Sequence, residues 1–184
     1  MSGCSSSILI CEQNKIIVSS VGNNLAYVYK QPNLNKNNNK NICVQLCEIH
    51  EPINNDERLR VQKNAGEIRK QKNDFFEKVF VRGRNYPGIE ITRCIGNQVA
   101  KKIGVISEPE VFSYDINKQN DLFIIIATRN FFDLIEQPEL YSILNSFNQK
   151  TVKQASDTLL KRIKNIQLQN EQIIEDFTFI LYYF

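Results

Sequence analysis

The stretch NDLFIIIATRNFFDLIEQPEL, residues 120–140, carries the strongest structural signal in the sequence. Its apolar and β-branched run from Leu122 to Ala127 is typical of a central strand. The residues after this run predict a helix, so the chain leaves the strand directly into a helix. Arg129 occupies the turn between the two elements, a position where binding and catalytic sites are commonly built. A permanent positive charge at such a turn needs an explanation.

The elements on either side of this stretch define the fold class. Short β-type runs come first, at residues 6–11, at residues 15–20 and in SVGNNLAYVYK. The Asn-rich tract of residues 31–41 cannot pack and is predicted to be an exposed loop. Later segments predict helices. INNDERLRVQKNAGE has Asn or Asp caps, a helical charge pattern and a stopping glycine at Gly66, and EITRCIGNQVAKKIG is a second predicted helix. DFTFILYYF closes the chain as a strand. Strands first and helices later in pairs predict a single α+β domain over residues 1–184.

Composition excludes several classes of protein. The 184 residues are 42% hydrophobic and 23% charged, with a net charge of only +3, which does not argue for nucleic acid or an anionic membrane as a partner. Five cysteines without a tight framework suit a reducing compartment. No stretch approaches membrane-spanning length, and no secretory signal is visible. We therefore expect an intracellular, cytoplasmic protein.

Six motifs occur in an order that points to one family. They are GCSSSILI, VGNNLAYVY, CEIHEPINNDERLRVQKNAGEI, PGIEITRCIGNQVAKKIGVISEPEV, DLFIIIATRNFFDLI and EDFTFILYYF. In sequence and order they resemble the motifs of the metal-dependent type-2C (PPM) serine/threonine protein phosphatases. The resemblance implies an antiparallel β-sandwich flanked by helices. It also implies a reaction in which two or more divalent ions on clustered aspartates activate water against a phosphoester.

The aligned metal positions depart from the family pattern. Asn23 and Asn97 stand at two family aspartates, Arg129 stands at the strand-end aspartate, and Glu175 stands at the final one. A hard cation needs several anionic oxygens, and a guanidinium within about 4 Å repels it by several kcal/mol. We therefore predict no metal, no cofactor and no catalytic residue, and hence a pseudophosphatase that is not an enzyme.

One hypothesis explains the charge at the turn. Arg129 occupies the vacated metal position and forms an ion pair with Glu175 across neighbouring strand ends, because a planar guanidinium suits a bidentate carboxylate. The alternative is that both side chains point to solvent after the pocket decayed.

The resemblance also implies that the opening third of the family domain, with its first strands and first helix pair, should precede Gly3. The chain is therefore expected to be a partial, N-terminally truncated fold. Protein partners or a second copy are predicted to cover apolar strand residues at Ser7–Ile10, Ile16–Val21 and Leu25–Tyr29. The alternative is a partial gene product whose missing third exists elsewhere.

Other chemical motifs are weaker. Cys43, Cys47 and His50 have a superficial metal-ligand spacing, but no fourth ligand is nearby, and ordinary buried cysteines are the favoured interpretation. Three arginines near the loop RGRNYPG could hold a phosphate, with a solvated or structural role as the favoured alternative. They are Arg82, Arg84 and Arg93.

Three functions follow from these observations. The first is a catalytically inactive phosphatase-like subunit with a structural or interaction role in a multiprotein assembly. Such an assembly would suit a cytoskeletal or ciliary location. The second is a phosphoprotein-binding regulator or decoy that uses the remnant pocket. The third is a working phosphatase completed by a separate N-terminal chain. The sequence names neither the partners nor the stoichiometry.

Overall fold

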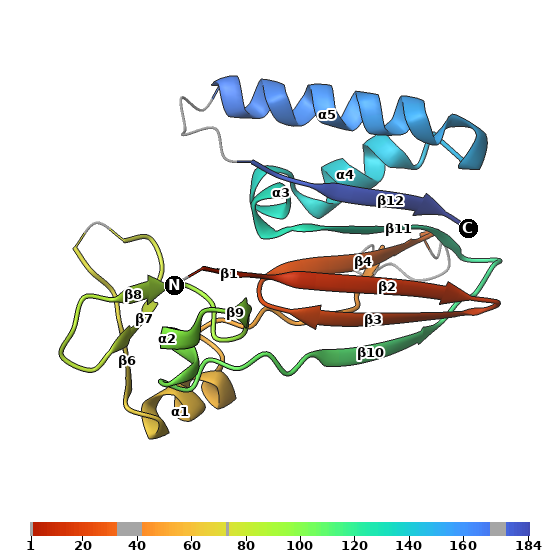
Figure 1. The fold of residues 1–184 in the computed structure, drawn as a ribbon. Helices are drawn as coiled ribbons and strands as arrows, with labels where there is room; N and C mark the ends of the chain where they lie inside the picture. Colours follow the sequence, from red (N-terminus) through yellow and green to blue (C-terminus); the bar gives the residue numbers. More distant parts are fainter. Residues whose placement is uncertain (1, 33–41, 73, 170–175) are drawn as a thin grey trace. The chain divides into compact units, whose positions relative to one another are not determined.

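A computed structural model describes residues 2–32, 42–72, 74–169 and 176–184 (Figure 1). The predicted loop at 31–41 lies outside the described residues except for Gln31 and Pro32, which are exposed. The chain divides into two compact units, each of which is described by itself. The first unit contains Met1–Ile10, Ile17–Asn24 and Cys47–Phe112, and the second contains Cys11–Ile16, Leu25–Leu46 and Ser113–Phe184. The single domain over residues 1–184 stays a prediction.

One three-stranded sheet has the order β10-β3-β2. Its strands are β2 (Ser6–Glu12), β3 (Lys15–Val21) and β10 (Glu110–Asp115). The alternation of a strand puts successive side chains on opposite faces, and in β3 the buried side chains include Ile16, Val18 and Ser20. The β-type runs predicted at residues 6–11 and 15–20 are thus confirmed.

The first unit adds two small antiparallel sheets and two helices. Strand β1 (Gly3–Cys4) pairs with β9 (Ile95–Gly96), and a second sheet has the order β6-β7-β8. The bounds of its strands and of the helices are β6 (Gly66–Arg69), β7 (Lys78–Val81), β8 (Pro87–Ile89), α1 (Asn55–Lys63) and α2 (Gln98–Lys101). Its apolar core consists of Val61, Val79, Cys94, Ala100, Ile103 and Val105.

The helix predicted in INNDERLRVQKNAGE is confirmed as α1, which ends at Lys63, before the predicted stop at Gly66. The Asn54 side chain caps the helix by accepting a hydrogen bond from the Asp56 backbone N–H at 3.2 Å. Acidic residues lie in the first turn and basic residues in the last, which matches the helix dipole. The helix therefore has a fixed start, and this start positions the buried Glu57 in its first turn.

The helix predicted for EITRCIGNQVAKKIG is wrong over most of its length. Only Gln98–Lys101 is helical, and Ile95–Gly96 is a strand. Gly96 and Asn97 have φ values of 81° and 52°, in the left-handed region that a continuous α-helix cannot contain. The apolar spacing thus predicted a helix where two consecutive backbone positions exclude one.

The second unit contains a four-stranded sheet in the order β12-β11-β4-β5. Its strands are β4 (Asn24–Lys30), β5 (Cys43–Gln45), β11 (Asp121–Thr128) and β12 (Phe179–Tyr183), and all of β4 except Asn24 belongs to this unit. The central strand predicted from Leu122 to Ala127 is confirmed as β11, which lies between β12 and β4. Strands β11 and β12 pair antiparallel, with Ile125 opposite Leu181.

Helices cover one face of this sheet (Figure 1). They are α3 (Arg129–Leu134), α4 (Gln137–Leu144), the 3-10 turn η1 (Gln149–Thr151) and α5 (Val152–Gln169). In α5 the buried residues Ala155, Leu159 and Ile163 recur every four positions, as an amphipathic helix requires. They pack in a core with Phe123, Phe131 and other side chains of the sheet and helices.

The predicted α+β class with antiparallel sheets is confirmed. Over the ranges that the structure describes, no helix combines the length and the apolar character needed to cross a membrane.

Candidate functional site

Asn23 follows Gly22 in the turn between β3 and β4. The Ser5 hydroxyl donates to the Asn23 amide oxygen at 2.9 Å. Gly22 has a φ of 101°, and a Cβ built on it would lie 2.1 Å from Ser5 Oγ. Glycine is therefore required both for the backbone conformation and for this close approach. The turn thus holds the Asn23 side chain against Ser5, the residue between β1 and β2, by an internal hydrogen bond.

Asn97 precedes helix α2 and acts as its N-cap. Its amide oxygen accepts from the Ala100 backbone N–H at 3.2 Å, and its own N–H donates to the Ser2 carbonyl at 2.7 Å. The residue is 5% exposed. A short amide side chain is well suited to its left-handed backbone conformation and to the capping bond. The Asn97 side-chain oxygen, which would face a cation at this position, thus already accepts a hydrogen bond from the Ala100 N–H.

Arg129 is the first residue of helix α3 in the second unit. Its guanidinium Nε lies 3.3 Å from Asp133 Oδ2, one helical turn further on. The Arg129 side chain is 16% exposed, so it does not project freely into solvent. Glu175 lies outside the described residues, and its pairing with Arg129 stays a prediction.

The described residues do not fit the divalent metals that the fold family implies. Neutral amides stand at Asn23 and Asn97, and their oxygens already accept internal hydrogen bonds. Within the described ranges, no group of three or more His, Cys, Asp or Glu side chains could hold a metal ion. A hard dication requires several anionic oxygens at close range. We therefore derive no reaction step through a metal from these residues.

The two cysteines and the histidine with a superficial metal-ligand spacing belong to different units. Cys43 lies in β5 of the second unit, while Cys47 and His50 belong to the first. The Cys47 thiol donates to the Asn24 carbonyl at 3.4 Å, and His50 Nδ1 lies 3.0 Å from both the N and the O of Gly22. Cys47 and His50 thus have local backbone partners.

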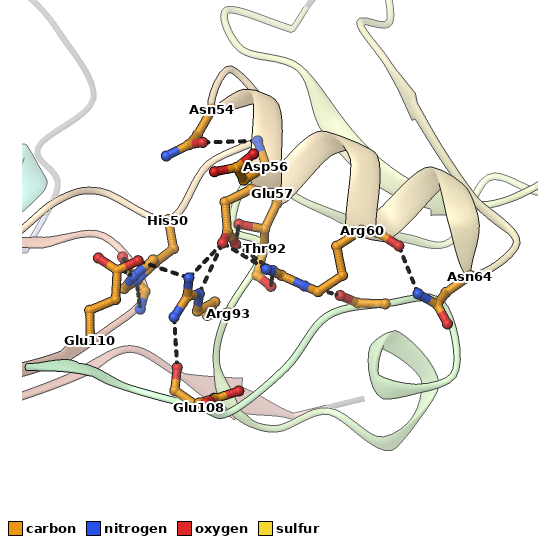
Figure 2. Close-up of polar contacts among 12 residues, drawn as sticks. His50, Asn54, Asp56, Glu57, Arg60, Asn64, Thr92, Arg93, Glu108 and Glu110 are labelled. Atoms are coloured by element: carbon orange, nitrogen blue, oxygen red, sulfur yellow. Dashed lines mark hydrogen bonds and ion pairs between the residues drawn. The ribbon is translucent and has the colours of Figure 1, made fainter.

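A buried charged cluster in the first unit was not predicted from the sequence. Its centre is the Glu57 carboxylate, which is 1% exposed (Figure 2). Arg60 donates to both of its oxygens, at 2.7 Å for Nη1 to Oε1. Arg93 donates to Oε1 through Nε at 3.0 Å and Nη2 at 2.8 Å, and the Thr92 hydroxyl donates to Oε2 at 2.5 Å. We call Glu57, Arg60, Thr92, Arg93, Glu110 and His50 the Glu57 cluster.

Hydrogen bonds determine the charge of Glu57. Burial raises the pKa of this carboxyl group, but donors from Arg60, Arg93 and Thr92 outweigh burial and leave the pKa at about 2. The group is therefore ionised at neutral pH, and two guanidinium groups compensate its charge.

Arg93 belongs to this cluster and not to an exposed phosphate site. Its guanidinium also donates to Glu110 Oε1 at 2.8 Å and to the Glu108 carbonyl at 3.1 Å. Arg82 and Arg84 lie instead on the exposed turn between β7 and β8. Arg82 donates to the Gln62 carbonyl at 3.2 Å. Of the three predicted phosphate contacts, only these two lie together on the surface, and their role stays a prediction.

His50 connects the Glu57 cluster to the Gly22–Asn23 turn. The His50 residue is 1% exposed, and its backbone N–H donates to the Gly22 carbonyl at 2.9 Å. Nδ1 lies 3.0 Å from the Gly22 N–H, which can donate to it when the ring is neutral. The proton is then on Nε2, which lies 3.4 Å from Glu110 Oε2, too far for a strong hydrogen bond. Burial, followed by the Arg93 charge, lowers the pKa of His50 below 6.5.

This lowered pKa predicts a loss of stability in mild acid. The unfolded chain binds a proton near pH 6.5 while the folded ring binds one only at lower pH, so the free energy of unfolding should fall as pH decreases through that value. The slope for one proton is at most about 1.4 kcal/mol per pH unit. Because His50 is the only histidine, His50→Gln should flatten the urea-unfolding free energy between pH 7.5 and 5.5. An equal slope in the two proteins would contradict this assignment.

Comparison with known proteins identifies the family. The family model described as Protein phosphatase 2C matches residues 1–171. The chain belongs to the protein phosphatase 2C family, as the motifs predicted. It is 32% identical over 102 residues to probable protein phosphatase 2C 12 of rice, covering 55% of this chain and 26% of that protein. It is 24% identical over 144 residues to the human integrin-linked kinase-associated serine/threonine phosphatase 2C, covering 78% and 33%.

Solved structures agree on the fold. A serine-threonine phosphatase 2C from Toxoplasma gondii superimposes with a TM-score of 0.83 at 17% identity, covering 98% of this chain and 58% of that one. A Caenorhabditis elegans sex determining protein gives a TM-score of 0.67 at 19% identity, covering 93% and 37%. In the comparison with curated proteins, this chain covers about a quarter of the rice phosphatase and a third of the human one.

The family match corrects one prediction. The expectation that the chain is a pseudophosphatase, and not an enzyme, is contradicted, because the matching family and the named relatives are protein phosphatases. The expectation rested on the residues at four aligned positions, while the match extends over 171 residues. The cytoplasmic, cytoskeletal or ciliary location stays a prediction.

Only one of the three segments predicted to contact a partner has exposed residues in the structure. Ile8 and Ile10 of β2 are 60% and 53% exposed, and Val111 of β10 is 65% exposed. By contrast, side chains of the other two predicted segments, such as Val18 and Val28, are fully buried within the chain. A partner that covers this surface stays a prediction, and Ile8 and Ile10 are the exposed residues within the three predicted segments.

Proposed function

We propose that this chain acts in the dephosphorylation of phosphoserine and phosphothreonine in proteins, as part of a protein phosphatase 2C. The single observation that supports this is the family match over residues 1–171. The named relatives are phosphatases, and this chain covers about a third or less of their length. The proposal therefore concerns the function of the whole protein to which this domain contributes.

The metal ligands of such a reaction have to come from outside the described residues. Asn23 and Asn97 offer neutral amides with internal donors, and Arg129 carries a positive charge next to Asp133. We propose that carboxylates from the rest of the protein, or from a companion chain, supply the anionic oxygens that a dication requires. The described part then supplies the scaffold and a contact for the substrate.

Arg82 and Arg84 are the residues proposed to contact the substrate. Both are exposed on the β7–β8 turn, and each guanidinium can donate to two phosphate or carboxylate oxygens at once. An acidic or phosphorylated segment of a protein would be attracted to such a turn. Arg93 takes no part, since the carboxylates of the Glu57 cluster surround it.

The test is phosphate release from phosphoserine and phosphothreonine peptides by the protein purified from its native source, with Mg²⁺, Mn²⁺ or a chelator. We expect turnover that the chelator abolishes. Arg82→Ala with Arg84→Ala should raise KM roughly tenfold with little change in kcat, because the lost contacts are made equally in ground and transition states. Lys118→Ala with Lys150→Ala, two exposed lysines of the second unit, is the charge-matched control. Absence of turnover with either metal would contradict the proposal.

A second role is supported by the exposed strand residues. We propose that a protein partner covers the outer face of β2, where Ile8 and Ile10 are more than half exposed. Stoichiometric partners that co-purify with the native protein should be lost when both residues are replaced by lysine. Retention of the same partners by that variant would contradict this role.

A further inference from the structure

Among the described strands, β12 is an edge strand that has a neighbour on one side only. It is the terminal strand of the sheet β12-β11-β4-β5, and only β11 pairs with it among the described strands. The helices of the second unit cover one face of this sheet (Figure 1). An uncovered edge exposes backbone N–H and C=O groups that can pair with another strand.

The hydrogen bonds between β12 and β11 show which backbone N–H and C=O groups of β12 point away from β11. The Phe184 N–H donates to the Leu122 carbonyl, and the Thr128 N–H donates to the Thr178 carbonyl. Because backbone direction alternates along a strand, the even-numbered residues of β12 bond to β11. The N–H and C=O groups of Phe179, Leu181 and Tyr183 therefore point away from β11. One of them has a partner, since Gln149 Nε2 donates to the Tyr183 carbonyl at 3.1 Å, and this oxygen has a second lone pair.

The side chains of β12 do not protect this edge. Natural edge strands are usually protected by lysine, proline, a bulge or a very short strand. The segment FTFILYYF, residues 177–184, has no charged side chain and no proline. Ile180 and Tyr182 are 67% and 49% exposed, whereas Tyr183 faces the helices and is buried. The opposite edge strand of the sheet, β5, is only three residues long.

We propose that β12 pairs antiparallel with β12 of a second copy of this chain, about a twofold axis at Leu181. In this register Leu181 faces its own symmetry mate, and Phe179 faces Tyr183 of the second copy. The outward N–H and C=O groups of these residues then bond across the interface.

The exposed side chains fit the same register. Ile180 lies opposite Tyr182 of the second copy, in a non-hydrogen-bonded pair, where side chains approach most closely. A β-branched residue opposite an aromatic one is a favourable cross-strand pair. Because the segment has no charged side chain, self-pairing brings no like-charged side chains together. The same register thus bonds the free backbone groups and covers both exposed side chains, which favours a second copy over an unrelated partner.

The full chain tests this in a dilution series by sedimentation velocity. We expect a dimer with a Kd in the micromolar range. Ile180→Lys with Tyr182→Lys sets two symmetry-related pairs of ammonium groups against each other and should raise the Kd at least tenfold. Ile180→Lys with Tyr182→Glu sets opposite charges against each other and should restore much of the dimer. Amide exchange at Phe179 and Leu181 should slow with concentration, while that at Ile180 should not.

The control variant is Ile53→Lys with Leu59→Lys, which adds the same charge at two exposed apolar positions of the first unit and should leave the Kd unchanged. Circular dichroism checks that each variant is folded. A wild-type chain that stays monomeric throughout the series overturns the proposal. So does a dimer that the two lysines at 180 and 182 leave intact, or one that both charge combinations weaken equally.

Discussion

Replacing Glu57 with alanine is expected to lower the free energy of unfolding by about 3–5 kcal/mol. The substitution removes a carboxylate that is 1% exposed and leaves the Arg60 and Arg93 guanidinium groups without their main partner. A buried charge that has lost its partner keeps its desolvation penalty, which is why removing one member of such a pair costs more than the pair contributes. Urea denaturation followed by circular dichroism measures the change, since the chain has no tryptophan.

The matched control for Glu57→Ala is Glu139→Ala. Glu139 accepts from Arg162 at 2.5 Å, but the two side chains are 36% and 42% exposed. Solvent screens an exposed pair, so its loss should cost at most about 1 kcal/mol. If the two substitutions lowered the free energy of unfolding equally, the Glu57 cluster would contribute no more to stability than an exposed ion pair does.

Replacing Phe131 with alanine is expected to lower the free energy of unfolding by about 3–5 kcal/mol. Phe131 is fully buried in helix α3, and its ring centre lies 5.2 Å from that of Phe179 in β12 and 6.1 Å from that of Phe177. Alanine would remove this contact between the helix and the last strand and leave a cavity in the core. The same denaturation experiment measures the loss.

Two further substitutions test whether the loss comes from the buried position of Phe131: one keeps most of its apolar volume, and the other removes an exposed ring elsewhere. Phe131→Leu keeps most of the apolar volume and should cost less than the alanine variant. Phe75→Ala removes an aromatic ring that is 88% exposed and should change stability by no more than about 0.5 kcal/mol. A Phe131→Ala variant as stable as Phe75→Ala would refute the assigned core.

The sequence predicted those elements whose signal is local. The β-branched run that became β11 and the capped, charge-patterned α1 both depend on residues within a few positions of one another. The helix expected up to Gly104 failed because hydrophobic spacing does not report the left-handed backbone at Gly96 and Asn97. Family membership was also predicted, since it rests on the order of several short motifs.

The candidate sites were harder to predict because their partners are distant in the sequence. Glu57 and Arg93 are 36 positions apart, and only the Glu57-x-x-Arg60 spacing on a helix gave a local sign of the cluster. Arg129 shows the converse, because a local ion-pair partner was overlooked. Asp133 lies one helical turn away at a spacing typical of helical ion pairs, while the pairing with Glu175 stays a prediction.

A single imidazole at the border of the Glu57 cluster has a practical consequence. Because the chain has one histidine, its ring protons give one set of signals in a magnetic resonance spectrum, and no residue assignment is needed. His50 contacts Gly22 on one side and faces Glu110 on the other. One resonance therefore serves as an intrinsic reporter of the turn that carries Asn23 when substrate, metal or a companion protein is added.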